Sequence, residues 1–95
     1  MALLAGPALA HSSGPTERDF NAAMAATCAD HSAKAKNVKC REIKEEATEF
    51  ECRYELPEFG GGWKKYVAYV AMDGAKWVWL DGETRCYESA ISKLK

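Results

Sequence analysis

Four cysteines are the residues whose type and spacing point most directly to chemistry. They are Cys28, Cys40, Cys52 and Cys86, in a chain of 95 residues. In an oxidising compartment they can form two disulfides, and a small domain with a limited core gains on the order of 2–4 kcal/mol from each. The alternative is a structural zinc site that uses Cys28 and His31, but the even spacing of the first three cysteines matches no zinc module. The pattern therefore predicts two disulfides and no metal or other cofactor.

One histidine offers a candidate for acid–base catalysis. His31 follows Asp30 directly, and a carboxylate beside an imidazole can support proton transfer. His31 falls near the buried face of a predicted helix, however, where a structural histidine is the commoner outcome. A small enzyme or enzyme accessory domain that uses His31 and Asp30 is therefore the alternative function, and the sequence leans away from catalysis.

The glycine run at residues 60–62 resembles a phosphate-binding loop only in composition. It leads into Trp63 and Lys64, whereas a phosphate cradle needs the N-terminus of a helix directly after the loop. The run is therefore interpreted as a mobile loop that could contact a partner through Phe59 and Trp63.

The first ten residues are uncharged and mostly small or apolar. They end in Ala8-Leu9-Ala10, the small-x-small pattern after which signal peptidases cut. We therefore expect residues 1–10 to be the remainder of a signal peptide, residues 11–15 to be a flexible linker and residues 16–95 to form a single domain. Together with the cysteines, this pattern predicts a secreted or periplasmic protein.

Charge and hydropathy exclude two classes of partner. The chain has 13 Lys and Arg against 14 Asp and Glu, a formal net charge of -1, and so lacks the basic excess of a nucleic-acid-binding protein. No later apolar run approaches the roughly 20 residues that span a bilayer. We expect neither nucleic-acid binding nor a membrane span.

The elements that must position these residues begin with one helix, predicted from Thr16 to Lys36. Thr16 can cap its first turn, and Asn37 can end it because asparagine tolerates the left-handed conformation. Apolar or small residues recur at three- and four-residue steps and define one buried stripe. The stripe consists of Phe20, Ala23, Met24, Thr27, Cys28 and His31.

After Asn37 the hydrophobic period changes to two, which predicts antiparallel strands. They are expected at residues 38–44, 49–56, 64–72 and 76–80. Asp73-Gly74 is expected to form the turn of the last hairpin, which sets Val70 opposite Trp77. Residues 81–82 predict a second turn into a fifth strand, and residues 87–95 fit either a strand or a frayed helix. The fold class is therefore α+β: one N-terminal helix packed on an antiparallel sheet of four or five strands, stabilised by disulfides.

The disulfide pairing depends on where the helix and the strands place the cysteines. Cys28 and Cys40 reach similar heights on the core side of the sheet, which favours Cys28 with Cys40 and leaves Cys52 with Cys86. The alternative, Cys28 with Cys52 and Cys40 with Cys86, stays open because four cysteines allow three connectivities.

The two sides of the last hairpin predict a core face and a binding face. The side with Trp77 and Trp79 carries no charge and is expected to face the helix. The other side is more apolar than a solvated face requires, and Arg85 joins two lysines at its rim. The predicted binding surface consists of Val67, Tyr69, Val78, Leu80, Phe59, Trp63, Lys65 and Lys76. We therefore expect a module that binds, or inhibits, another protein, or self-associates, through this outer face.

Overall fold

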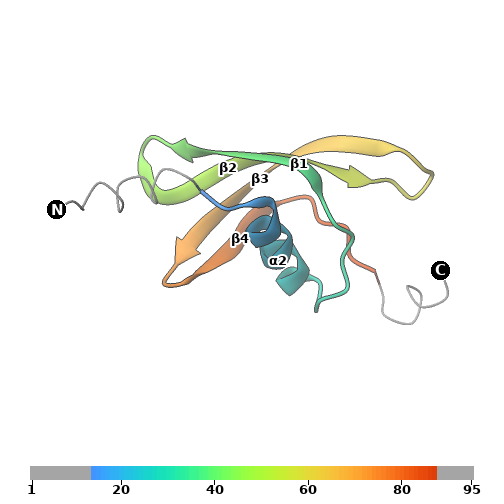
Figure 1. The fold of residues 1–95 in the computed structure, drawn as a ribbon, viewed down its shortest axis with the longest axis horizontal. Helices are drawn as coiled ribbons and strands as arrows, with labels where there is room; N and C mark the ends of the chain where they lie inside the picture. Colours follow the sequence, from blue (N-terminus) through green and yellow to red (C-terminus); the bar gives the residue numbers. More distant parts are fainter. Residues whose placement is uncertain (1–13, 88–95) are drawn as a thin grey trace.

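The structure, a computed structural model, describes residues 14–87. A helix, α2 (Glu17–Thr27), precedes four strands: β1 (Lys36–Ile43), β2 (Glu46–Pro57), β3 (Trp63–Asp73) and β4 (Lys76–Gly82). The strands form one antiparallel sheet in the order β1-β2-β3-β4, and α2 packs against one face of it (Figure 1). The predicted disulfide-stabilised α+β fold is therefore confirmed. In the described part of the chain, no helix is both long and apolar enough to cross a membrane.

The start of α2 is the predicted one. The hydroxyl of Thr16 accepts a hydrogen bond from the Asp19 N–H at 3.0 Å, and the Asp19 carboxylate accepts one from the Thr16 N–H at 3.0 Å. This capping box satisfies two N–H groups that a helix start leaves without partners. Of the predicted stripe, Phe20, Ala23, Met24 and Cys28 are buried, whereas Thr27 and His31 are exposed.

The predicted end of the helix is wrong, because α2 stops at Thr27. Ala29 and Asp30 take left-handed φ angles of 51° and 65°, which a helix cannot continue through. The chain then runs extended, and the Ala35 N–H donates to the side-chain oxygen of Asn21 at 2.7 Å. Ala35 is buried in the core, so tertiary packing overrides the helix propensity of this alanine- and lysine-rich segment.

β1 pairs with β2, and Cys40 lies opposite Cys52. The alternation predicted for β2 is confirmed, since Phe50, Cys52, Tyr54 and Leu56 are all buried. β1 begins at Lys36, earlier than expected, and contains an irregularity near its start. Asn37 does take a left-handed φ of 54°, but within this irregular stretch of a strand rather than at a helix end.

The hairpin between β3 and β4 turns one residue later than predicted. Asp73 pairs with Lys76, so the two turn residues are Gly74 and Ala75. Gly74 supplies the positive φ, 65°, at the first turn position, where glycine meets no steric penalty. Asp73 therefore belongs to β3 and not to the turn.

This later turn changes which residues pair across the hairpin, but the tryptophans of β4 still point to the predicted face of the sheet. Val70 lies opposite Trp79 rather than Trp77, and Trp77 lies opposite Met72. A register shift of two residues leaves the side chains as far as Trp79 on their original faces of the sheet. A β-bulge at Leu80 then sets Asp81 opposite Tyr69 and Gly82 opposite Ala68. The predicted core face is therefore correct, and Ala68 and Val70 are completely buried on it.

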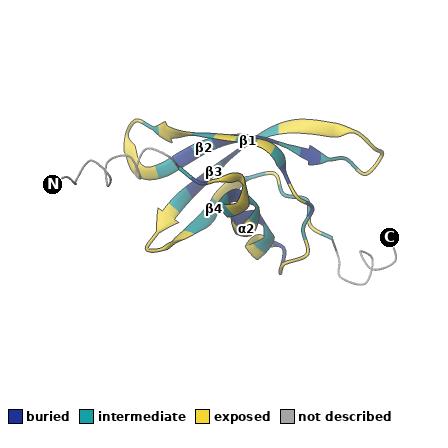
Figure 2. Ribbon diagram, viewed as in Figure 1, coloured by how far each residue is buried: buried dark blue, intermediate teal, exposed yellow. Residues whose placement is uncertain are grey.

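The core lies where α2 covers the sheet. The Phe20 ring centroid is 4.8 Å from that of Tyr54 and 5.0 Å from that of Trp79. The buried Tyr54 hydroxyl donates to the backbone carbonyl of Glu83 at 2.5 Å, and burial raises the pKa of this phenol above its usual value. Burial concentrates near the helix and falls away toward the ends of the hairpins (Figure 2).

The predicted fifth strand does not form among the described residues. β4 ends at Gly82, and the chain returns to the segment that follows the helix. There Cys86 forms an isolated antiparallel bridge with Ser32, and the Ala33 N–H donates to the Arg85 carbonyl at 2.8 Å. Residues 88–95, for which a strand or a frayed helix was expected, lie outside the described part.

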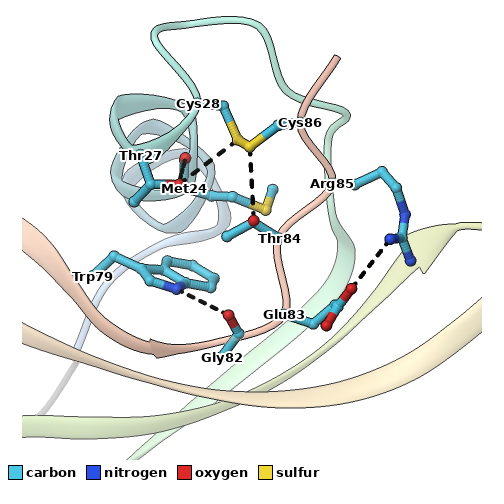
Figure 3. The surroundings of a disulfide bond; sticks show 9 residues. All are labelled: Met24, Thr27, Cys28, Trp79, Gly82, Glu83, Thr84, Arg85 and Cys86. Carbon is cyan, nitrogen blue, oxygen red and sulfur yellow. Dashed lines mark hydrogen bonds and ion pairs between the residues drawn. A yellow bond between two sulfur atoms is a disulfide. The ribbon is translucent and has the colours of Figure 1, made fainter. Parts of the chain in front are cut away.

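The structure corrects the disulfide pairing, because neither of the two expected connectivities occurs. Cys28 is bonded to Cys86 (Figure 3), and Cys40 is bonded to Cys52. The Cα atoms are 5.1 Å apart in the first pair and 4.0 Å apart in the second. The prediction failed because it extended the helix too far and continued the sheet beyond Gly82.

Candidate functional site

One side of β3 and β4 faces away from α2 and carries apolar side chains. We call it the outer strip, and it consists of Val67, Tyr69 and Ala71 of β3 with Val78 and Leu80 of β4. Ala71 pairs with Val78, which fixes both strands to the same face. Val67 is 43% exposed and Leu80 is 47% exposed, and the other three residues are half-buried. The fold thus brings Val67, Tyr69 and Val78 together on one face, and Leu80 lies at a β-bulge beside them, where Asp81 pairs with Tyr69.

The two lysines predicted to frame this surface lie near its ends. Lys76 lies opposite Asp73 at the hairpin turn, and Lys65 lies opposite Glu55 near the start of β3. Both lysines are exposed. The outer strip therefore has a cationic side chain toward each end.

Trp63 extends this face to the beginning of β3. Its side chain is 47% exposed, and the Lys36 ammonium lies 3.9 Å from a ring centroid. This is a cation–π contact, which orients the indole without covering it. Trp63 and Lys65 are separated from Val67 by even numbers of residues along β3, so the period of two places them on the same side of the strand.

Charged residues of β1 and β2 flank the outer strip, and the sequence-based prediction missed them. Lys39 pairs with Arg53, which pairs with Val67. These residues, together with Lys65, line an open hollow of about 560 Å³ beside the strip. The alternation of charged and apolar residues in β2 was a visible signal, but only the strand pairing places Arg53 next to Val67.

Tyr69 is held by a polar network across three strands. Arg41 donates from Nε to the Glu51 carboxylate at 2.6 Å, and the Tyr69 hydroxyl donates to the other oxygen of that carboxylate at 3.4 Å. The hydrogen bond from Arg41 lowers the pKa of Glu51 below its usual value. The phenol is therefore oriented toward β2 while its ring stays on the outer strip.

Phe59 is not part of the outer strip, although it was predicted to belong to the same surface. It is 80% exposed, and its ring centroid lies 5.3 Å from the Arg85 guanidinium. The loop around it, predicted to be mobile, has internal hydrogen bonds: the Glu58 N–H donates to the Gly62 carbonyl and the Gly61 N–H donates to the Glu58 carbonyl, both at 2.9 Å. Phe59 therefore lies beside Arg85, near the end of the sheet where β2 and β3 are joined.

Arg85 anchors this loop rather than framing the outer strip. Its side chain is only 11% exposed, and it donates to the Pro57 carbonyl at 3.0 Å, to the Glu58 carboxylate at 2.7 Å and to the Tyr66 hydroxyl at 3.1 Å. These partners raise the pKa of the guanidinium against the opposing effect of its burial. The expected position was wrong because the chain returns toward the helix at residue 83.

We expect the Arg85→Lys variant to lose about 2 kcal/mol of unfolding free energy. A lysine ammonium group keeps the positive charge, but it cannot donate to all the acceptors that the planar guanidinium of Arg85 reaches. Each hydrogen bond to a charged group contributes about 1.5–3 kcal/mol. Urea unfolding measures the loss, and amide hydrogen exchange at Gly61 is expected to become faster. An Arg18→Lys variant, at an exposed helix position, is the control. Equal stability of the two variants would contradict the anchoring role.

The residues of the catalytic alternative lie in the turn after α2. Asp30 and His31 are both exposed, and the His31 backbone carbonyl accepts a hydrogen bond from the Tyr87 N–H at 2.6 Å. Asp30 lines an open hollow of about 470 Å³ beside the helix, together with Ser32 and Lys34. Within residues 14–87, no group of three or more His, Cys, Asp or Glu side chains could hold a metal ion, and catalysis by His31 and Asp30 stays a prediction.

Comparison of the chain with protein-family models, with curated proteins and with solved structures finds no significant match.

Proposed function

We propose that this protein is a small secreted or periplasmic module that binds another protein through the outer strip. The observation that carries the proposal is the exposure of large apolar side chains on a sheet face that α2 does not cover. Of the five large apolar side chains that are exposed among the described residues, Trp63 and Val67 lie on this face, and Leu80 lies at the β-bulge beside it. Such a patch on a small domain is typical of an interaction surface.

The surroundings of the outer strip support a protein partner over a small molecule. The strip runs across two strands, and charged side chains from β1 and β2 border it. An apolar centre with a polar rim is the usual anatomy of a protein–protein interface. Tyr and Trp residues are also enriched among the side chains that contribute most to such interfaces.

The two disulfides are consistent with an oxidising compartment outside the cytosol. The leader at residues 1–10 supports export, and it lies outside the described residues. A secreted or envelope protein is therefore the class of partner that we propose.

We expect Val67→Glu to weaken capture of the partner at least tenfold. A buried carboxylate at the centre of an apolar interface costs on the order of 2 kcal/mol or more. The fold itself should tolerate the change, because Val67 is 43% exposed and pairs with Arg53. Quantitative affinity capture from the secreted and envelope fractions of the source cell, with wild-type and variant chains side by side, measures the effect.

Met72→Glu is the matched control for this experiment. Met72 is also a large apolar side chain, 36% exposed, but it lies opposite Trp77 on the helix side of the sheet. We expect this variant to capture the partner as well as the wild type does. If both variants retain capture, the outer strip does not bind the partner; if both lose it, the binding surface is not confined to the strip.

A further inference from the structure

The free edge of β4 has unused backbone groups. β4 is an edge strand of the sheet, and Asp73 pairs with Lys76 directly beside the two-residue turn. In such a hairpin the pair next to the turn is hydrogen-bonded, and hydrogen-bonded and non-hydrogen-bonded pairs then alternate. Trp77 and Trp79 therefore direct their N–H and C=O groups away from β3, toward the open edge.

No other described segment pairs with these groups. Within residues 14–87, no backbone hydrogen bond outside the strand ladders involves the main chain of Trp77 or Trp79. An unpaired strand edge of this kind accepts an extended backbone, because only another strand supplies N–H and C=O groups at the same spacing.

The β1 edge of the sheet is interrupted near both ends, whereas the β4 edge is regular from Lys76 to Trp79, before a β-bulge at Leu80. β1 alternates charged side chains at Lys39 and Arg41, and its pairing is interrupted near both ends. Charge and bulges are the usual protection of an exposed edge. In β4, residues 77–80 are Trp-Val-Trp-Leu without a charge or a proline. Strand addition is therefore open along the regular stretch of β4 from Lys76 to Trp79, and β1 offers no comparable stretch.

The sequence of β4 is complementary to itself in the antiparallel direction. If a two-fold axis passes beside Val78, Trp77 of one copy lies opposite Trp79 of the other. All outward N–H and C=O groups of these two residues then find partners. Each Lys76 comes near the bulge at Leu80 and Asp81 of the other copy, which brings opposite charges together.

We propose that a second copy of this chain pairs with β4 in this register, so that one antiparallel sheet continues across two copies. The two outer strips then become one surface, with the Val78 side chains facing each other at its centre. This inference goes beyond the proposed function, because the outer strip can bind a foreign protein whether or not β4 is paired.

The test uses charge at the two-fold axis. In a dimer of the Val78→Lys variant, two ammonium groups would face each other across the strand pair. In a dimer of the Val78→Glu variant, two carboxylates would do so. Like charges directly opposite each other destabilise strand pairing. Each variant alone is expected to be a monomer, while an equimolar mixture of the two recovers the dimer. Val67→Lys is the control, because it places the same charge on the outer strip but on β3, away from the edge.

The readout is the molar mass of the full chain in solution, measured by light scattering over a dilution series. We expect the wild type and Val67→Lys to reach twice the mass of a single 10.5 kDa chain at high concentration. The near-ultraviolet circular dichroism of the tryptophans checks that each variant is folded. A wild type that stays monomeric, a mixture that does not recover the doubled mass, or an equal loss in Val67→Lys would each overturn the proposal. The first of these outcomes leaves partner capture by the outer strip unaffected.

Discussion

Replacing Cys28 and Cys86 together by alanine is expected to lower the free energy of unfolding by about 4 kcal/mol. The two residues are 58 positions apart, and a cross-link that closes a long loop removes more entropy from the unfolded chain than one that closes a short loop. The stability of a small domain is about 5–15 kcal/mol, so the loss is a large part of the total. The bond also holds residues 83–87 beside the helix end (Figure 3).

The Cys40/Cys52 double alanine variant is the matched comparison. These residues are 12 positions apart, and the same model gives a loss of about 3 kcal/mol. Urea unfolding of the wild type and both variants, under non-reducing conditions, measures the two losses. A smaller loss for the Cys28/Cys86 variant than for the Cys40/Cys52 variant would contradict the account based on loop length.

Gly82→Ala is expected to cost about 3–5 kcal/mol, as much as a disulfide. Gly82 lies opposite Ala68 at the end of β4. A Cβ atom on Gly82 would lie 2.4 Å from the Cβ of Ala68 and 2.7 Å from its Cα, and the Gly82 φ of 137° is a conformation that side chains rarely adopt. The backbone of β3 would have to move, because Ala68 has no flexible side chain that could yield.

Gly74→Ala separates the two causes of this cost. Gly74 also has a positive φ, 65°, but a Cβ atom there meets nothing within 4 Å. Only the conformational penalty remains, and we expect a loss of about 1 kcal/mol. Thermal or urea unfolding of both variants tests the difference. Equal losses would mean that the approach of Gly82 to Ala68 does not matter for stability.

The local features of this fold could be predicted from the sequence because short-range physics fixes them. The capping box at Thr16, the alternation in β2 and the faces of the last hairpin all depend on residues close together in the chain. The faces survived an error in the turn because the side-chain period of a strand is two. The positions of Val67, Tyr69 and Val78 on one surface followed from that period alone, whereas the β-bulge at Leu80 was not predicted.

The features that depend on distant partners could not be predicted. The helix ends early because the following segment carries Ala35 into the core. There Ala35 is buried against a sheet that is made of residues later in the sequence. The Asp81-Gly82 pair has the composition of a turn, yet both residues remain in β4, where they pair with Tyr69 and Ala68 after a β-bulge. The wrong prediction of the disulfide pairing followed from these two errors, because the pairing depends on the paths of both segments.

The sequence predicted which apolar residues make up the candidate site, but it did not predict which residues surround them. The apolar residues of the outer strip are visible in the alternation of β3 and β4. The neighbouring Lys39 and Arg53 required the strand pairing, and the burial of Arg85 required the return of the chain to the helix. For the same reason the sequence did not show that Phe59 lies beside Arg85 rather than on the outer strip.

The Cys28–Cys86 bond has a topological consequence. Backbone and disulfide together form a closed covalent ring that contains all four strands. Exposed loop tips are the preferred sites of proteolytic cleavage, and the loop that carries Phe59 is such a tip. A single cut there opens the ring and releases no fragment, so the outer strip stays attached to the helix in a nicked molecule.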